Sequence, residues 1–387
     1  TRVRSSAASD VYKRQFQDWS VPDLSEIKPI PVEQLLIDAP GGQTARLNTD
    51  LFVKRARVER LGRPAAAMAL LTLQTYAPSG GQGHRTSLRG GGPLTTLVDP
   101  RVLDPGVNPS DQPLWRKLWA NVETEVQWSQ RTPRVTSGID AVFPWLSPTR
   151  VSNSAPGMTT TPSDVHPLQA YFGLPRRIRM DFGEAGQCDL TGLRDEHTVV
   201  AFRMRNHGVR YVGWRHPLSP YYRSKLSGEW LPVHGQPGGV GWRDWLGLAL
   251  RAPDAALREP AAAVAAFYSR ADQISVGEIR IHAFGYDMDN MKARGWTESA
   301  LPMFTGADTR RQRLLADAAG RLVNGAGIAA TALIGAVKAG LFQRPQDAPG
   351  DLSQVKTDLW SATESDFFAA VRHVALDAPP GVADAVC

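Results

Sequence analysis

Six glycines and three basic side chains are concentrated in one segment, APSGGQGHRTSLRGGGPLTT, at residues 77–96. The basic side chains are His84, Arg85 and Arg89. A glycine-rich backbone can approach a flat or grooved partner closely, because no side chain stands in the way, and guanidinium groups can hold phosphates. The segment could therefore cradle a phosphate, supply a catalytic site or contact a nucleic acid.

The context of this segment argues against a nucleotide-binding loop. A Walker loop needs Gly-Lys-Ser/Thr ahead of a helix, whereas the sequence here is Gly-His-Arg-Thr at 83–86. Pro64 opens the run PAAAMALLTLQTY, which predicts a helix that ends before Ala77-Pro78. The glycines follow the C-terminal end of that helix, which is the wrong end for holding a phosphate through the helix dipole. We expect no nucleotide and no other cofactor.

The histidines, cysteines and serines form no recognisable catalytic or metal-binding motif. The sequence has no HExxH motif, no two histidines four residues apart and no Gly-x-Ser-x-Gly elbow. Cys188 and Cys387 alone cannot make a four-cysteine zinc site. We therefore expect no bound metal.

The run DMDNMK at 287–292 begins like a calcium-binding loop, with Glu298 at the twelfth position. Its fifth and sixth residues are Met and Lys, where an oxygen ligand and a glycine are needed, so a calcium site is not expected. A loop after a strand, with Asn290 and Met291 at its tip, fits the run better. Such a tip could wedge into a stacked duplex, and a solvated turn is the open alternative.

The elements that must position these residues change character along the chain. Short strand-like runs separated by Pro and Gly occupy 93–250, and GEIRIHAFGY at 277–286 alternates as a strand does. After Thr305 the pattern is helical to the end. The sequence thus predicts an α+β fold, with a mixed domain with long loops at 16–305 and a C-terminal, four-helix-type bundle at 306–387 that is expected to be incomplete.

The first fifteen residues, TRVRSSAASDVYKRQ, resemble a translated sequencing adapter more than the start of a domain. We expect residues 1–15 to be a non-native leader and leave them out of the fold prediction.

Composition restricts the partners and the setting. The chain has 44 Lys and Arg against 38 Asp and Glu, a net charge of +6, which permits a polyanionic partner without demanding one. Two distant cysteines give no disulfide framework, so a cytoplasmic location is the simplest expectation. The uncharged, apolar run at 322–337 is shorter than the roughly 20 apolar residues of a membrane span. We expect it to form a buried helix in a soluble protein and expect no membrane partner.

Several motifs together resemble a known family, CasA, the large subunit of the type I-E CRISPR surveillance complex called Cascade. The most specific motif is ALLTLQTYAPSGGQGHRTSLRGGGPLTTLV at 69–98, a helix followed by Ala-Pro, a glycine loop, Leu-Arg-Gly-Gly and Pro-x-Thr-Thr. Further motifs are DQPLW at 111–115, HPLSP at 216–220 and FGYDMDNMKARGW at 284–296. The resemblance extends over most of 16–387.

The resemblance implies a mixed N-terminal domain followed by a four-helix bundle, without a catalytic centre. It implies that the chain recognises the protospacer-adjacent motif in double-stranded DNA, helps to open the duplex for pairing with guide RNA, and provides a docking surface for a helicase-nuclease. The implied partners are target double-stranded DNA, guide RNA, the other Cascade subunits and the helicase-nuclease effector.

Three elements of that family read DNA from the minor groove: a glycine loop, a lysine finger and a wedge that carries a glutamine. In this sequence they fall on Ser79, Gly80, Gly81, Gln82 and Gly83, on Lys225, and on Asp289, Asn290 and Met291. The family can also carry glycine at the places of Ser79 and Gln82. Asn290 stands where the glutamine is expected, and because Asn is shorter, the wedge should insert less deeply or rely on Met291.

Two further sets of contacts are expected around these elements. Arg85 and Arg89 are expected to hold phosphates beside the glycine loop. The segment LLIDAPGGQTARLNTDLF at 35–52 resembles the family's loop that meets the 5′ end of the guide RNA and the neighbouring subunits. Arg46 and Phe52 could serve there by charge and by stacking.

Two other functions remain open at the level of sequence. One is a phosphate- or nucleotide-binding enzyme that uses the glycine-rich loop at 79–92, and the other is a purely structural helical scaffold. The glycines themselves have a plainer alternative, namely tight turns between the helix and the strand PLTTLV.

Overall fold

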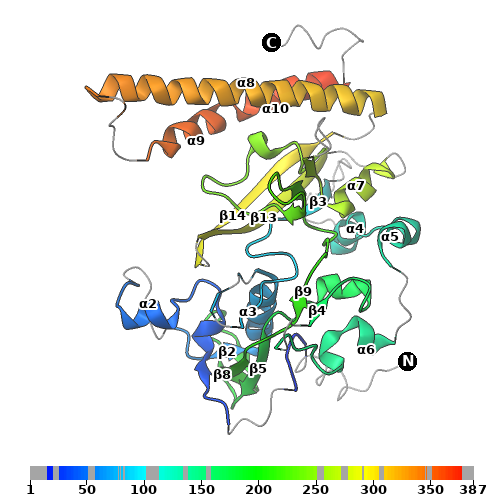
Figure 1. Ribbon diagram of the computed structural model, residues 1–387, viewed down its shortest axis with the longest axis vertical. Helices are drawn as coiled ribbons and strands as arrows, with labels where there is room; N and C mark the ends of the chain where they lie inside the picture. Colours follow the sequence, from blue (N-terminus) through cyan, green and yellow to red (C-terminus); the bar gives the residue numbers. More distant parts are fainter. Residues whose placement is uncertain are drawn as a thin grey trace. The chain divides into compact units, whose positions relative to one another are not determined.

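A computed structural model describes residues 15–20, 26–50, 57–76, 78, 80–81, 83–101, 113–133, 138–153, 158–250, 257–271, 278–289, 292–304, 309–344, 346 and 351–376. The chain divides into two compact units, and Figure 1 shows its course through them. The first unit comprises Thr1–Pro93, Ser129–His216 and Met288–Gly295. The second comprises Leu94–Trp128, Pro217–Asp287 and Trp296–Cys387, so each unit collects segments that are distant in sequence.

The first unit is built on strand β8 (Thr198–Arg205), which is antiparallel to three others. These are β1 (Ile30–Pro31), β2 (Leu61–Gly62) and β5 (Arg177–Phe182). Alternate residues of β5 are buried, Ile178 and Met180 among them, as expected for a strand with one face on the core. Helix α3 (Arg63–Tyr76) supplies buried Ala66 and Leu70 to the same core.

Helix α3 confirms the predicted helix ahead of the glycine segment. It begins at Arg63, next to Pro64, and ends at Tyr76. The carboxylate of Asp195 accepts hydrogen bonds from the backbone N and from Nε of Arg63, both at 2.8 Å. A negative charge at a helix N-terminus is stabilising, so this end of α3 is fixed to the strand that carries Asp195.

The other elements of the first unit are short. They are η1 (Val32–Leu35), α2 (Gly42–Arg46), α6 (Ile139–Val142), η3 (Pro144–Leu146), η4 (Pro167–Tyr171), the parallel pair β4 (Thr159–Thr160) and β9 (Arg210–Tyr211), and the antiparallel pair β6 (Gly186–Gln187) and β7 (Arg194–Asp195).

The second unit contains two three-stranded sheets. In one, β13 (Glu278–Asp289) lies between β3 (Thr95–Arg101) and β14 (Lys292–Met303). The predicted alternation is confirmed, because Ile279, Ile281 and Ala283 of β13 are all buried. In the other, β10 (Tyr221–Arg223) lies between β11 (Trp230–Pro232) and β12 (Arg258–Glu259). The helices α4 (Leu114–Ala120), η5 (Trp242–Asp244) and α7 (Ala262–Tyr268) come from the same stretches of chain, and α5 (Glu125–Arg131) crosses the boundary at Trp128.

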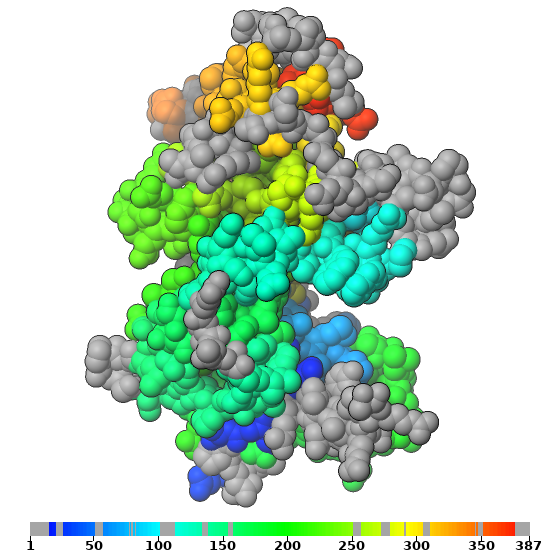
Figure 2. Space-filling view, turned by 90° about the vertical axis from the view of Figure 1, so that its right-hand side faces the viewer, coloured from blue at the N-terminus to red at the C-terminus, as the bar shows by residue number. Residues whose placement is uncertain are grey.

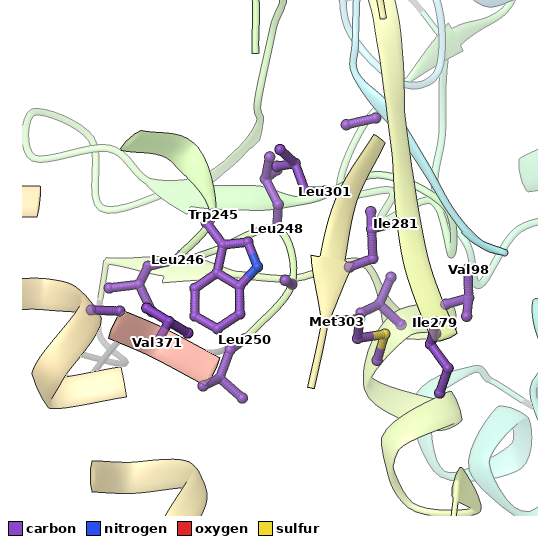
Figure 3. Close-up of a cluster of buried hydrophobic side chains, with 14 of the residues drawn as sticks. Val98, Trp245, Leu246, Leu248, Leu250, Ile279, Ile281, Leu301, Met303 and Val371 are labelled. Carbon is purple, nitrogen blue, oxygen red and sulfur yellow. The ribbon is translucent and has the colours of Figure 1, made fainter. Parts of the chain in front are cut away.

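One hydrophobic core joins the strands of the second unit to its C-terminal helices. Trp245 is fully buried, and Figure 3 shows it between Leu250 and Val371 on one side and the strand residues Ile281 and Met303 on the other. Three helices follow the strands in the described part of the chain, namely α8 (Thr309–Leu341), α9 (Ser353–Ala362) and α10 (Glu364–Leu376). The α+β class and the helical C-terminal region are thus confirmed.

The apolar run at 322–337 does not form the buried helix that the sequence predicts. It belongs to α8, a helix of 33 residues, whereas α9 and α10 have 10 and 13 residues and leave much of it uncovered. Leu315 and Ala319 of its first half are buried, but Ile328 is 73% exposed. Residues Arg310–Leu341 are long and apolar enough to cross a membrane by length and composition alone, and 6% of their most apolar window is buried.

Candidate functional site

The glycine loop begins directly after the last residue of α3. Ser79 and Gln82 lie outside the described residues, whereas Gly80, Gly81 and Gly83 are described. Gly81 and Gly83 have φ angles of +78° and +75°, a region that only glycine adopts without strain. A Cβ on Gly83 would stand 2.7 Å from Cβ of Asn206, whereas one on exposed Gly81 would meet only the His84 ring, at 3.6 Å. The loop is therefore anchored at Gly83 and presents bare backbone at Gly81.

The second group of glycines, at 90–92, has a structural role. A Cβ on Gly91 would stand 2.8 Å from Cα of Pro78, and the amide of Gly92 donates to the carbonyl of Tyr76 at 3.0 Å. This turn therefore closes the C-terminal end of α3 and packs against the start of the glycine loop. For the glycines at 90–92, the structure therefore favours the alternative of tight turns between the helix and the following strand.

Two buried polar residues that the sequence did not single out hold the start of the loop. Gln74 of α3 donates through Nε2 to the carbonyl of Arg176 at 2.9 Å and accepts from the Arg176 amide at 3.0 Å. Arg176 in turn donates through Nη2 to the carbonyl of Pro78 at 2.6 Å. Burial lowers the pKa of Arg176 to about 10, so the guanidinium keeps its charge at neutral pH. No local pattern marks either residue, because their partners are 98 or more residues away.

Two histidines lie beside the loop. The pKa of His84 is lowered, first by burial and then by the charge of Arg176, so the ring is neutral at pH 7. His207 has a φ of 63° and donates from its backbone amide to the carbonyl of Gly83 at 2.7 Å. The loop is thus tied to both α3 and the end of β8 by groups without negative charge.

The two arginines predicted to hold phosphates have different surroundings. Arg89 is only 7% exposed, and its charge adds to burial in lowering the pKa of neighbouring His216. Burial of this side chain does not favour the predicted phosphate contact of Arg89, which stays a prediction. Arg85 is half-buried and donates through Nε and Nη2 to Oγ and O of Ser152, both at 2.7 Å. Its phosphate contact stays a prediction.

Lys225 occupies the turn that joins β10 to β11. The turn is closed by hydrogen bonds from the Ser224 amide to the Glu229 carbonyl at 2.8 Å and from the Gly228 amide to the Ser224 carbonyl at 2.9 Å. Lys225 is exposed and forms no ion pair with any residue that the structure describes, and Leu226 beside it is fully exposed. The turn therefore presents a cation to solvent, as a finger requires.

The predicted wedge is the tip of a β-hairpin. Asn290 and Met291 lie outside the described residues, but they join the end of β13 to the start of β14. Asp289, the last residue of β13, has a side chain that is 53% exposed and lies 3.6 Å from Nη1 of Arg294. The predicted strand ahead of the wedge is confirmed, and a second long strand begins at Lys292.

Strand β14 carries functional candidates that the sequence prediction missed. Lys292, Arg294 and Trp296 are spaced two apart, so they share one face of the strand. Trp296 is 49% exposed, and its ring centroid lies 5.0 Å from that of Tyr286 on β13. The sequence pattern that could have revealed them is KARGW at 292–296, in which every second residue is a cation or an aromatic residue. In a strand, such residues lie on the same face.

The guide-RNA prediction falls partly outside the described chain. Arg46, the last residue of α2, is exposed and donates through Nη2 to Oε1 of Gln43 at 2.7 Å. Phe52 lies outside the described residues. The contact with RNA or neighbouring subunits stays a prediction.

A pocket of about 710 Å³ lies beside α4, part of the cyan surface in Figure 2. The rings of Trp115 and Trp119, exposed by 63% and 55%, contribute to its wall with centroids 4.7 Å apart. Arg270, also in the wall, donates through Nη2 to the carbonyl of Ala120 at 2.7 Å. The pocket is mostly apolar, and Arg270 in its wall is hydrogen-bonded to the end of α4. No group of three or more His, Cys, Asp or Glu that could hold a metal occurs within the described part of the chain.

The three elements predicted to read DNA are divided between the two units. The glycine loop and Met288–Gly295 belong to the first unit, and Lys225 belongs to the second. Their convergence on one DNA duplex stays a prediction. Among their described residues, Gly81, Lys225 and Asp289 are exposed and lie at or next to the ends of regular elements, which is typical of binding surfaces.

The fold is similar to that of solved structures of CRISPR-associated proteins. It is similar to the crystal structure of CasA from Thermus thermophilus, with a TM-score of 0.59 and 17% identity over 94% of this chain and 71% of that one. It is also similar to the crystal structure of Cse1 from Thermobifida fusca (TM-score 0.60, 15% identity, 98% and 72% covered). A chain of a structure described as a CRISPR RNA-guided surveillance complex matches with a TM-score of 0.61 and 17% identity, over 98% of this chain and 73% of that one.

At these identities the likeness shows the fold alone. The family model of the CRISPR-associated protein Cse1 matches residues 13–385, and the chain belongs to that family. No curated protein sequence matches it significantly.

Proposed function

We propose that this chain is the non-catalytic large subunit of an RNA-guided antiviral surveillance complex and that it reads the protospacer-adjacent motif in double-stranded DNA from the minor groove. The observation that carries the proposal is the anchored glycine loop, which presents bare backbone at exposed Gly81. Membership of the Cse1 family and the likeness to a chain of an RNA-guided surveillance complex support it.

The geometry of each element suits minor-groove binding. That groove is narrow and its donor and acceptor pattern is degenerate, so a side-chain-free loop and one long cation fit it better than a helix does. Gly81 provides the loop and Lys225 the cation. The tip of the β13–β14 hairpin would then occupy the gap between base pairs and offset the cost of unstacking, a few kcal/mol per step.

The proposal includes the partners of such a complex. Guide RNA and other Cascade subunits would contact the surface around exposed Arg46, and a helicase-nuclease would dock on the assembled complex. The enzyme alternative receives no support from the loop, because its glycines follow the C-terminal end of α3.

The test is reconstitution of a surveillance complex that lacks its large subunit. Adding this chain should restore motif-dependent binding to duplex DNA, measured by gel shift or fluorescence anisotropy. Lys225→Ala should weaken binding several-fold, because a cation near phosphates contributes through counterion release. Replacement of Asp289, Asn290 and Met291 by Ala should also weaken it.

Lys356→Ala is the matched control, since Lys356 is an exposed lysine on α9 and its loss changes the net charge equally. Unchanged binding by both the Lys225 and the hairpin-tip variants would overturn the site assignment. Metal- or nucleotide-dependent turnover by the isolated chain would favour the enzyme instead.

A further inference from the structure

The start of the glycine loop rests on a buried cation. Arg176, immediately ahead of β5, is 8% exposed and holds the carbonyl of Pro78 through Nη2 at 2.6 Å. Its own backbone is fixed to Gln74 by two hydrogen bonds, at 2.9 and 3.0 Å. Pro78 is also the residue against which Gly91 packs, so the guanidinium is held at the point where the chain leaves α3 for the loop.

Among the residues that the structure describes, no carboxylate offsets the charge of this guanidinium. Nη1 is buried and has no hydrogen-bond partner. Burial is the cause that lowers the pKa of Arg176, and no carboxylate contributes in the opposite direction. A buried charge without a partner is costly, and such a cost calls for a compensating anion.

The neighbouring groups do not supply that anion. His84, whose pKa is lowered partly by Arg176, is neutral at pH 7. Arg85, also near the loop, is itself a cation bonded to Ser152. The described residues of the loop, Gly80, Gly81 and Gly83, have no side chains. A polyanion lying over the loop would meet positive potential and no carboxylate among these groups.

We infer that Arg176 is the positioning residue of the glycine loop and the buried cation through which the loop attracts the phosphates of bound DNA. The inference rests on the proposed function and deepens it, because it assigns the electrostatic part of loop binding to a residue beneath the loop. The guanidinium fixes the Pro78 carbonyl, and its unoffset charge acts through the low-dielectric interior, where electrostatic interactions are less screened than in water.

Two substitutions separate the positioning role from the charge. Arg176→Gln keeps a side-chain N–H for the Pro78 carbonyl but removes the charge. Arg176→Lys keeps the charge but loses the planar fork that can donate from two nitrogens at once. Arg194→Gln, on the exposed strand β7 of the same unit, is the control for loss of one formal charge.

The experiment measures duplex affinity of the reconstituted complex between roughly 50 and 200 mM salt, the range in which phosphate contacts dominate. We expect Arg176→Gln to weaken binding several-fold at low salt and to make the slope of log affinity against log salt shallower by about one, as for loss of one phosphate interaction. Arg176→Lys should keep the wild-type slope, and Arg194→Gln should keep both slope and affinity.

Several results would overturn the inference. One is an Arg176→Gln complex that is folded, by its melting temperature, and keeps wild-type affinity and slope. Another is an equal loss of duplex affinity in the Arg176→Gln and Arg176→Lys complexes with no change in the salt slope. That result would mean that Arg176 has a structural role only. If the Gln variant does not assemble, the Lys variant decides, because a shallower slope for Lys contradicts the proposal. Failure of the wild-type complex to bind duplex would count against the proposed function instead.

Discussion

At the scale of single residues, Gly81 and Gly83 show that one backbone conformation can serve two purposes. Both have positive φ angles, of +78° and +75°. Gly83 is enclosed by Asn206 and His207, whereas Gly81 is exposed. Gly83 therefore anchors the loop, and Gly81 is left accessible for the proposed contact with DNA.

Substitution by alanine should separate these two purposes. Gly83→Ala should lower the free energy of unfolding by about 2–3 kcal/mol, because it adds strain at a positive φ to a clash with Cβ of Asn206. Gly81→Ala should cost about 1 kcal/mol, the strain alone, yet weaken duplex binding. Urea denaturation and duplex titration of both variants test this. Equal stability losses would show that Gly83 is not enclosed as described.

The buried histidines predict how stability depends on pH. The pKa of His216 lies well below its ordinary value, first because of burial and then because of the charges of Arg89 and Arg131. The folded state therefore resists protonation that the unfolded chain accepts near pH 6.5. The stabilisation is present above that pH and is lost as the pH falls below it.

The free energy of unfolding should therefore fall between about pH 6.5 and 5, by up to ~1.4 kcal/mol per pH unit for each such histidine. Urea denaturation at several pH values would measure the slope. His216→Gln should flatten it, and His197→Gln, an exposed histidine, should not. A slope that His216→Gln leaves unchanged would show that this residue is not the source.

At the scale of elements, the candidate site depends on how helices and strands end. Helix α3 is fixed at its start by Asp195 and at its end by the turn at 90–92, so the glycine loop leaves it at a defined place. The β13–β14 hairpin has two strands of 12 residues each, and β13 pairs with β3 on its other side. Pairing on both sides of β13 stiffens the hairpin, and a residue that is to insert between base pairs requires a stiff support.

Helix α8 should tolerate substitution very differently in its two halves. Leu315→Ala should lower the free energy of unfolding by about 2–5 kcal/mol, because Leu315 is 1% exposed and its removal leaves a cavity. Ile328→Ala should change it by less than about 1 kcal/mol, because Ile328 is 73% exposed. Thermal or urea unfolding compares the two. A large loss at Ile328 would show that another part of the protein covers it.

At the scale of the whole molecule, each of the two units has a core of its own. The first centres on residues such as Leu70, Ile178 and Phe202, and the second on Trp245 and Phe267. The sequence prediction divides the chain instead at 305, where strands give way to helices. That boundary stays a prediction, whereas the second unit's core runs across it from Ile281 to Val371.

Much of the candidate site followed from local sequence. A proline-led run of good helix formers predicts α3 and its end, and the alternation of Ile279 and Ile281 predicts β13, because backbone propensity and side-chain periodicity are properties of neighbours in the chain. The order of motifs from 69 to 296 likewise led to the family, which the match over residues 13–385 confirms.

Only the tertiary structure decided which of these side chains are exposed to solvent and which residues hold the glycine loop in place. Local sequence did not show that Arg89 is buried or that the apolar half of α8 is largely exposed, since burial depends on segments that are remote in sequence. Arg176 escaped notice because its partner Gln74 is 102 residues away. The sequence by itself determined where the glycine loop begins and which family the chain belongs to. Folding determined that buried Arg176 holds the start of that loop at Pro78, because it alone brings α3 and the start of β5 together.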